Sequence, residues 1–225
     1  MSQQLTETCD PQTSVTRSLL GYGVIAGPVY VAVSLVQALT REGFDVTRHA
    51  WSLLANGDLG WIHVTNFLVV AAATLAAAVG LGRTLTSGPG ATWVPRLIGV
   101  YGVGLIASGI FRADPAMGFP AGTPEGPGVV SLHGTLHFVA GAVGFVCLTV
   151  ACLIVARRFA GEGRRGWAVY SGVTGAFFLL SFAAVATGGG ASWATLTFVA
   201  GVVAIWGWLS ALSLHLYRRA TPRRG

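Results

Sequence analysis

The sequence is poor in charge, in cysteine and in lysine. Only 10% of its 225 residues are charged, whereas a soluble domain usually carries about 25%, so an ordinary soluble domain is excluded. The three cysteines, Cys9, Cys147 and Cys152, form no CxxC pair, which excludes a disulfide framework and a cysteine-based zinc motif. All 14 basic residues are arginine, and the missing lysine indicates no particular function.

What the chain does have is long apolar sequence. Hydrophobic residues make up 53% of it, and the mean hydropathy is +0.66, which is typical of a membrane protein. The net charge of +6 would suggest nucleic acid in a soluble protein. Here the arginines flank apolar segments, so membrane topology explains them better and no nucleic-acid partner is expected.

Apolar segments of the length that spans a bilayer, about 20 residues, predict an all-α integral membrane bundle. Pro28 lies inside the first segment, where its missing N–H predicts a kink. We expect a tail at 1–18, one membrane domain at 19–217 and a basic tail at 218–225. The six predicted spans are 19–39, 61–82, 94–112, 131–156, 167–187 and 193–216.

The arginines also predict the orientation of the bundle. If both termini lie on the same side, eleven of the 14 arginines lie on that side, and only Arg41, Arg48 and Arg112 lie on the other. Because arginine is enriched on the cytoplasmic side of membrane proteins, we expect a multi-pass protein of the cell membrane with both termini in the cytoplasm. The long connections 40–60 and 113–130 would then lie outside.

The connection 40–60 contains a pattern typical of a short helix. The Asp45 carboxylate can accept hydrogen bonds from the free amides of a first helical turn. Asn56 and Gly57 both tolerate a left-handed conformation, which commonly ends a helix. We therefore predict a short interfacial helix near 46–55, lying across the outer mouth of the bundle.

Four of the five histidines are predicted to gather at the outer face. His133 and His137 are four residues apart, so on a helix they share one face and can bind the same metal ion. Zinc would need further ligands, for which His63, His49 and Asp114 are the candidates. The alternative is that these histidines cap helix ends or make hydrogen bonds between helices.

Other polar residues near this face are candidates for catalysis or substrate binding. Asp114, Asp58 and Glu125 are candidate bases for a metal-bound water. Each candidate also has a structural interpretation: Arg112 with Asp114 as an interfacial ion pair, Asn66 as a hydrogen bond between helices. Ser131 is expected to be the N-cap of the fourth helix. The candidate substrate contacts are Trp51, Ser52, Asn66 and Arg112.

Several stretches resemble a known bacterial family, the domain of unknown function 998. They are the run GYGVIAGPVYVAVSLVQALTREGFDVTRHAWSLLANGDLGWIHVTNF and the motifs FRADPAMGFPAG and SLHGTLH. The resemblance implies a six-helix membrane protein with polar motifs, but no established substrate. The motif residues it implies are His49, Ser52, Asn56, Gly57, Asp114, Pro115, His133 and His137. More distantly, the layout is similar to membrane hydrolases related to alkaline ceramidase, which use a three-histidine zinc site.

The leading hypothesis is therefore a membrane-embedded, metal-dependent enzyme, such as a hydrolase, that acts on a lipid or another amphipathic substrate at the membrane surface. A non-catalytic protein that binds lipid or a small molecule, or a transporter, is the alternative from another class. Two further hypotheses are a haem-linked redox protein and a metal-free isoprenoid isomerase or cyclase that uses Asp114 as its acid. Membrane lipids are the expected surroundings in every case.

Overall fold

A computed structural model describes residues 11–220 as six long α-helices joined by two long and three short connections, with no β-strand in that range. Each helix is long and apolar enough to cross a membrane, which confirms the predicted all-α membrane class. Residues 1–10 and 221–225, which make up most of the predicted tails and include Cys9, lie outside the described residues. The helices are α1 (Pro11–Thr40), α2 (Gly60–Thr84), α3 (Trp93–Ile110), α4 (Leu132–Gly161), α5 (Arg165–Thr187) and α6 (Ser192–Arg219).

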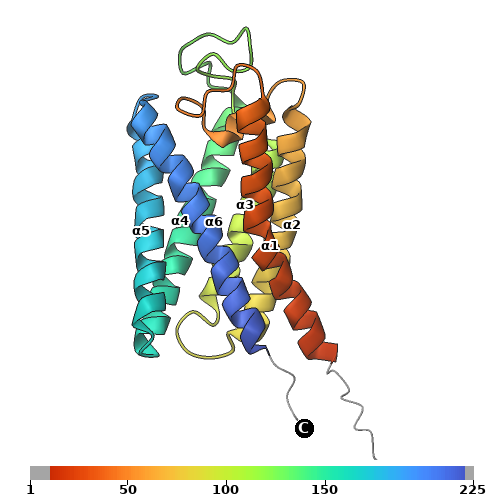
Figure 1. The fold of residues 1–225 in the computed structure, drawn as a ribbon, viewed down its shortest axis with the longest axis vertical. Coiled ribbons are helices and arrows are strands. Elements are labelled where there is room, and N and C mark those ends of the chain that lie inside the picture. The colour runs from red at the N-terminus through yellow and green to blue at the C-terminus, as the bar shows by residue number, and fades with distance from the viewer. Residues whose placement is uncertain (1–10, 221–225) are drawn as a thin grey trace, which may run out of the picture.

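The helices form a closed ring in chain order. Each packs against the next one, and α6 packs back against α1, so the bundle has an inside and a lipid-facing outside (Figure 1). The connections at 41–59, 111–131 and 188–191 lie at one end of the bundle. The two described ends of the chain lie at the other end, together with the connections 85–92 and 162–164.

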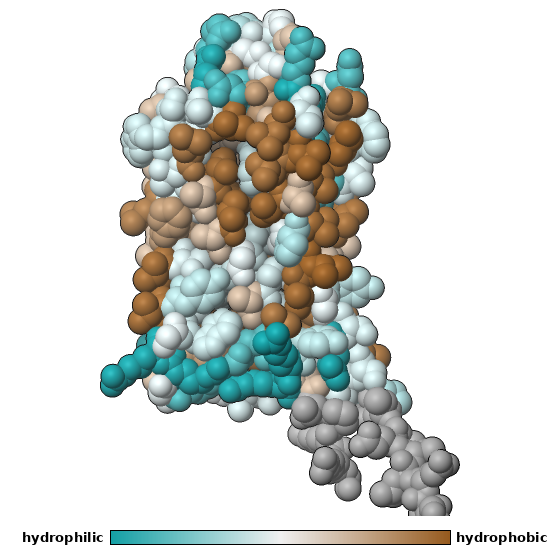
Figure 2. All heavy atoms as spheres, in the orientation of Figure 1, coloured by the Kyte–Doolittle hydropathy of each residue, from teal (hydrophilic) through white to brown (hydrophobic). Residues whose placement is uncertain are grey.

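The surface of the ring matches a bilayer. Figure 2 shows apolar side chains gathered in a broad band along the bundle, with hydrophilic residues at both ends. Large apolar side chains such as Leu39, Val143 and Leu180 are more than two-fifths exposed on this outer surface. In lipid that exposure costs nothing, because hydrocarbon surrounds these side chains instead of water.

Two helices extend beyond the predicted spans. α1 begins at Pro11, eight residues before the apolar segment, and α4 continues through Arg157 and Arg158 to Gly161. Arginine is a good helix former, so apolar length alone underestimates these helices. Pro28 lies within α1, and the ribbon of α1 changes direction part-way along (Figure 1).

The predicted interfacial helix near 46–55 is not confirmed. A five-residue 3-10 helix, η1 (Trp51–Ala55), is the helical part of this connection. The Asp45 carboxylate accepts hydrogen bonds from the Thr47 amide at 2.8 Å and the Thr47 hydroxyl at 2.7 Å. It therefore forms a local turn two residues ahead instead of starting a longer helix.

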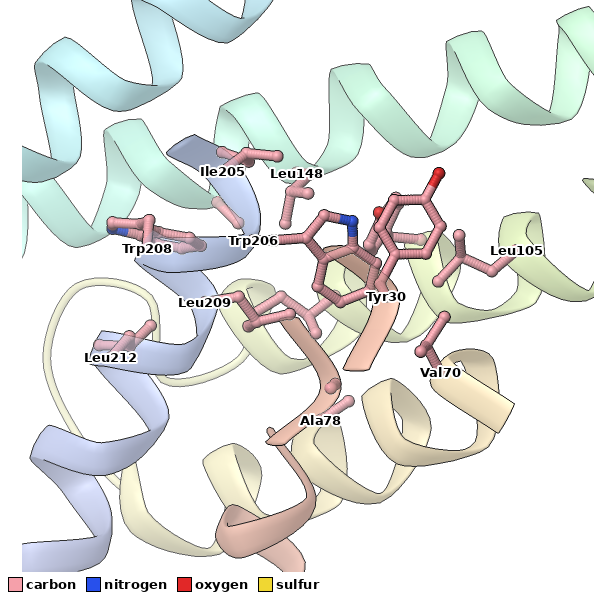
Figure 3. Packing of buried hydrophobic residues seen from close by; sticks show 14 of the residues in the cluster. Tyr30, Val70, Ala78, Leu105, Leu148, Ile205, Trp206, Trp208, Leu209 and Leu212 are labelled. Carbon is pink, nitrogen blue, oxygen red and sulfur yellow. The ribbon is translucent and has the colours of Figure 1, made fainter. Parts of the chain in front are cut away.

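The centre of the ring is filled by large side chains from several helices. Tyr30 of α1 stacks on Trp206 of α6, with ring centroids 5.1 Å apart. Figure 3 shows these two rings together, with Val70 of α2, Leu105 of α3 and Leu148 of α4 around them. These buried side chains pack the helices of the ring against one another.

Close contact between α1 and α6 predicts a sharp response to substitution at Gly27. An added Cβ there would lie 2.8 Å from the Trp206 carbonyl oxygen, and backbone cannot move aside without separating the helices. We expect Gly27→Ala to destabilise the protein by about 1–3 kcal/mol, the usual cost of overpacking. Thermal unfolding of the purified protein in detergent measures this effect.

The matched control is Gly21→Ala on the same helix. A Cβ at Gly21 meets no atom within 4 Å, so this substitution should leave stability unchanged or raise it through better helix propensity. Equal melting temperatures for the two variants would contradict the close packing of α1 on α6.

Candidate functional site

A cavity of about 140 Å³ lies inside the ring, toward the end that carries the long connections. Every one of the helices α1–α6 contributes to its wall, and Trp51 and Ser52 of η1, with the preceding Ala50, line the end nearest the long connections. Ten of the 24 lining residues are aromatic. These are Tyr30, Trp51, Phe67, Tyr101, Phe138, Phe145, Phe178, Phe182, Phe198 and Trp206. The cavity is therefore an aromatic chamber within the bundle.

His137 is the histidine that lines this cavity, and its surroundings fix its hydrogen bonding. Its Nδ1 lies 2.9 Å from the Phe111 carbonyl oxygen and 3.2 Å from that of Ser108. Carbonyl oxygens only accept hydrogen bonds, so Nδ1 carries the proton and donates it. In the neutral ring, Nε2 is then a lone-pair acceptor. This arrangement leaves one ring nitrogen without a backbone partner on a residue that lines an apolar chamber.

Two connections form a roof above the cavity, and Arg41 ties the first of them together. Its guanidinium donates to the Leu54 carbonyl at 2.6 Å and to the Asn56 carbonyl at 2.7 Å. Burial lowers the pKa of Arg41 from its ordinary value, and the negative charge of Asp58 opposes that effect. Asn56 in turn donates from Nδ2 to the Ala113 carbonyl at 3.0 Å, which joins the first connection to the second.

His49 makes a second link across the roof. Its Nδ1 accepts a hydrogen bond from the Asp45 amide at 2.9 Å, so Nε2 carries the proton and donates to the Met117 carbonyl at 2.9 Å. The ring packs against Phe44 and Phe119 and is 2% exposed. Both ring nitrogens have backbone hydrogen-bond partners, one in each connection, so His49 joins the two connections.

The exposed edge of the roof carries an ion pair between the connections. Arg48 and Glu125 meet at 2.6 Å, and the neighbouring carboxylate raises the pKa of Arg48. Exposed pairs of this kind contribute little stability. Glu125, a candidate base, thus lies at the surface of the roof, and Asp58 and Arg112 are exposed as well.

Asp114 lies at the start of α4, where it completes the helix cap. Its carboxylate accepts hydrogen bonds from the Ser131 hydroxyl and from the Ser131 amide, the latter at 2.8 Å. Ser131 Oγ in turn accepts from the Gly134 amide at 3.0 Å, which confirms Ser131 as the N-cap. A negative charge is favourable at a helix N-terminus, so this position gives Asp114 a clear structural role.

His63 belongs to a separate buried cluster between α1 and α2. The Gln37 amide Nε2 donates to His63 Nδ1 at 3.3 Å, and Asn66 Nδ2 donates to the Tyr30 carbonyl at 3.2 Å. Asn66 therefore makes the expected hydrogen bond between helices. The Phe67 ring lies next to both His63 and His137, with centroid distances of 4.7 and 6.3 Å.

The four outer histidines thus occupy four different environments. His49 joins the roof connections, His63 faces α1, His137 lines the cavity, and His133 is exposed with its ring against Phe111. Within residues 11–220 no group of three or more His, Cys, Asp and Glu side chains is placed to hold one metal ion. Zinc binding stays a prediction from the sequence.

Of the predicted substrate contacts, Trp51 and Ser52 line the cavity. Asn66 faces α1 instead, and Arg112 is exposed. The aromatic wall was missed by sequence reasoning, because most of its rings lie in the middle of apolar segments. Their one signal was an aromatic residue within every predicted span, near the middle in most of them, and that pattern is also typical of an ordinary core.

Comparison with known proteins gives one match. The family described as "Protein of unknown function (DUF998)" matches residues 24–215. The match includes every residue that lines the cavity and both connections that form the roof. No curated protein and no solved structure matches the chain.

Close packing at the start of α4 predicts that Gly134 holds Asp114 in place. A Cβ at Gly134 would overlap the Asp114 carboxylate, so Gly134→Ala should displace the carboxylate and weaken the helix cap. The loss of a cap typically costs about 1 kcal/mol. We expect a lower melting temperature and faster amide hydrogen exchange in the first turn of α4.

Gly141→Ala on the same helix is the control for this test. The nearest atom to its added Cβ is a Phe145 ring carbon at 4.0 Å, so it should keep the cap intact. A Gly134→Ala variant with unchanged exchange at 132–135 would show that Asp114 does not depend on this glycine.

Proposed function

We propose that this chain, which belongs to the DUF998 family of proteins of unknown function, binds an amphipathic small molecule within its ring of helices. The apolar part of the molecule occupies the aromatic cavity, and its polar end meets His137. The observation that carries this proposal is a chamber lined by aromatic rings with one oriented histidine nitrogen beside it.

The size and lining of the cavity support a small ligand group. Its volume of about 140 Å³ is close to that of an apolar protein cavity of about 150 Å³ that binds benzene. A ring or a short branched chain therefore fits inside, and a whole lipid does not. Any longer tail would have to leave the chamber between helices, where half-buried Phe182, Val185 and Phe198 lie.

The polar groups of the cavity lie where a ligand head would be expected. Besides His137, the hydroxyls of Ser52 and Ser108 belong to residues that line the cavity near the roof. Ligand sites typically combine a mainly apolar wall with a few polar groups that fix orientation. Here the wall is mainly aromatic, and His137, Ser52 and Ser108 supply polar groups near the roof.

An enzyme that acts on the same molecule is a second candidate. The observation that favours it is the pair of carbonyls, from Ser108 and Phe111, that orient His137. A general base needs such an orienting partner and a free nitrogen toward its substrate. In this version His137 Nε2 acts as the base that takes a proton from the ligand hydroxyl and becomes an imidazolium, with Nδ1–H still held by the two carbonyls.

The arginine distribution supports a cytoplasmic position for the termini and an external position for the roof. A ligand would then reach His137 from the outer side of the membrane. In a chain whose native cysteines are replaced by alanine, Gly126→Cys and Gly161→Cys place one thiol at each end of the bundle. An added Cβ meets no atom within 4 Å at either position, so both variants should fold.

We expect a membrane-impermeant maleimide to label Gly126→Cys in intact cells and Gly161→Cys only after the cells are opened. The reverse pattern would contradict the orientation. Labelling of both thiols in intact cells would contradict it as well, because the inner end must be protected.

Filling the cavity tests the binding proposal directly. Gly141 lines the cavity and has room for a larger side chain, so Gly141→Leu should occupy it. We expect benzyl alcohol, as an amphipathic probe, to bind the wild-type protein in calorimetric titration. Its affinity for the Gly141→Leu variant should be at least tenfold lower.

Gly207→Leu is the matched control, because Gly207 is exposed on α6 and its Cβ would meet no atom within 4 Å. It should bind the probe like the wild type. Equal heats for all three proteins would mean that the probe partitions only into detergent, and the binding proposal would fail.

A further inference from the structure

The chemical class of the ligand can be narrowed from the groups that line the cavity; this step rests on the proposed binding function. None of the described residues that line it is Asp, Glu, Lys or Arg. An ionised ligand group would lose its water there without gaining a partner, which is strongly unfavourable. The part of the ligand inside the cavity is therefore neutral.

The wall favours an aromatic ring over an aliphatic chain. Phe145 meets Phe178 and Phe182 edge to face, with centroid distances of 5.0 and 5.1 Å and interplanar angles of 78°. Tyr30 and Trp206 form a stacked pair with an interplanar angle of 27°. These contacts show how the rings of the wall pack on one another, and the same rings line the cavity. An aromatic guest can add edge-to-face or stacking contacts to such rings, which a saturated chain cannot make.

His137 sets a polar requirement of fixed direction, whereas the serine and tyrosine hydroxyls of the lining can either donate or accept a hydrogen bond. Because its Nδ1–H donates to two backbone carbonyls, its Nε2 can only accept a hydrogen bond while the ring is neutral. The matching ligand group is a neutral donor, which on a small ring is a hydroxyl or an N–H, and the phenolic O–H is the more acidic and therefore the stronger donor of the two. A carbonyl or ether at the same place would leave the imidazole lone pair without a partner.

We infer that the cavity binds a neutral phenol-type group, an aromatic ring whose hydroxyl donates a hydrogen bond to His137 Nε2. The ring lies among the rings of α1–α6, and the hydroxyl points toward the end of α3. A tail on the same ring would lie outside the cavity, because a volume of about 140 Å³ holds little more than the ring.

A series of matched probes tests this inference by calorimetric titration of the full chain in detergent. The probes are 4-ethylphenol, 4-ethylanisole, 4-ethylcyclohexanol and 4-ethylbenzoate, with Gly141→Leu as the background for partition into micelles. We expect 4-ethylphenol to bind best. 4-Ethylanisole, in which the hydroxyl is replaced by a methyl ether, should bind about tenfold more weakly, as expected for the loss of one hydrogen bond. The charged 4-ethylbenzoate should bind least.

A variant at the histidine separates the hydrogen bond from general packing. In His137→Phe the planar ring is kept while both nitrogens are lost, so position 137 has no hydrogen-bond acceptor. We expect the variant to bind 4-ethylphenol and 4-ethylanisole equally and still to prefer both over 4-ethylcyclohexanol. The melting temperature of this variant shows whether the fold is kept. If the fold is lost, the four probes on the wild-type protein decide the inference alone.

The outcomes distinguish this inference from the proposed function. Binding of all four probes with similar affinity to the wild type, and none to Gly141→Leu, would overturn the phenol class and leave the binding function standing. A preference for 4-ethylcyclohexanol or the benzoate would also overturn it. The absence of any probe binding above the Gly141→Leu background would overturn both.

Discussion

The close approach of α1 and α6 closes the ring, and the cavity exists only because the ring is closed. Gly27 lets the α1 backbone lie against the Trp206 carbonyl, and Tyr30, one turn further on, stacks on the Trp206 ring. Small residues permit such contacts between membrane helices, where no water drives association. If α6 moved away from α1, the wall of the cavity would open to lipid.

The roof is the second requirement, and it is built by polar contacts instead of packing. Arg41, His49 and Asn56 each bind backbone carbonyls of the connections 41–59 and 111–131. These contacts hold η1, with Trp51, over the outer end of the cavity. Charged and hydrogen-bonding residues that would have been costly inside the bilayer thus have a structural use at its edge.

The helical membrane class could be predicted from the sequence, because a membrane-spanning helix is recognised by its length and apolar composition alone. The N-cap at Ser131 was also readable, since its pattern is local. The metal hypothesis depended on where His49, His63 and His137 point, and that is set by partners such as Gln37 and Met117 that lie far away in the sequence. The aromatic cavity could not be predicted for the same reason: a ring at mid-span faces either lipid or the interior, and the weakly amphipathic helices do not say which.

The central claim is that the closed ring encloses a ligand site beside His137. A crystal structure of the protein soaked with 4-bromophenol tests it most directly, because the bromine can be located by its anomalous signal. The account predicts a bromine peak inside the ring, among Tyr101, Phe178 and Trp206, with the phenol oxygen next to His137 Nε2. Bromine found only on the lipid-facing surface, with the interior closed by side chains, would contradict it.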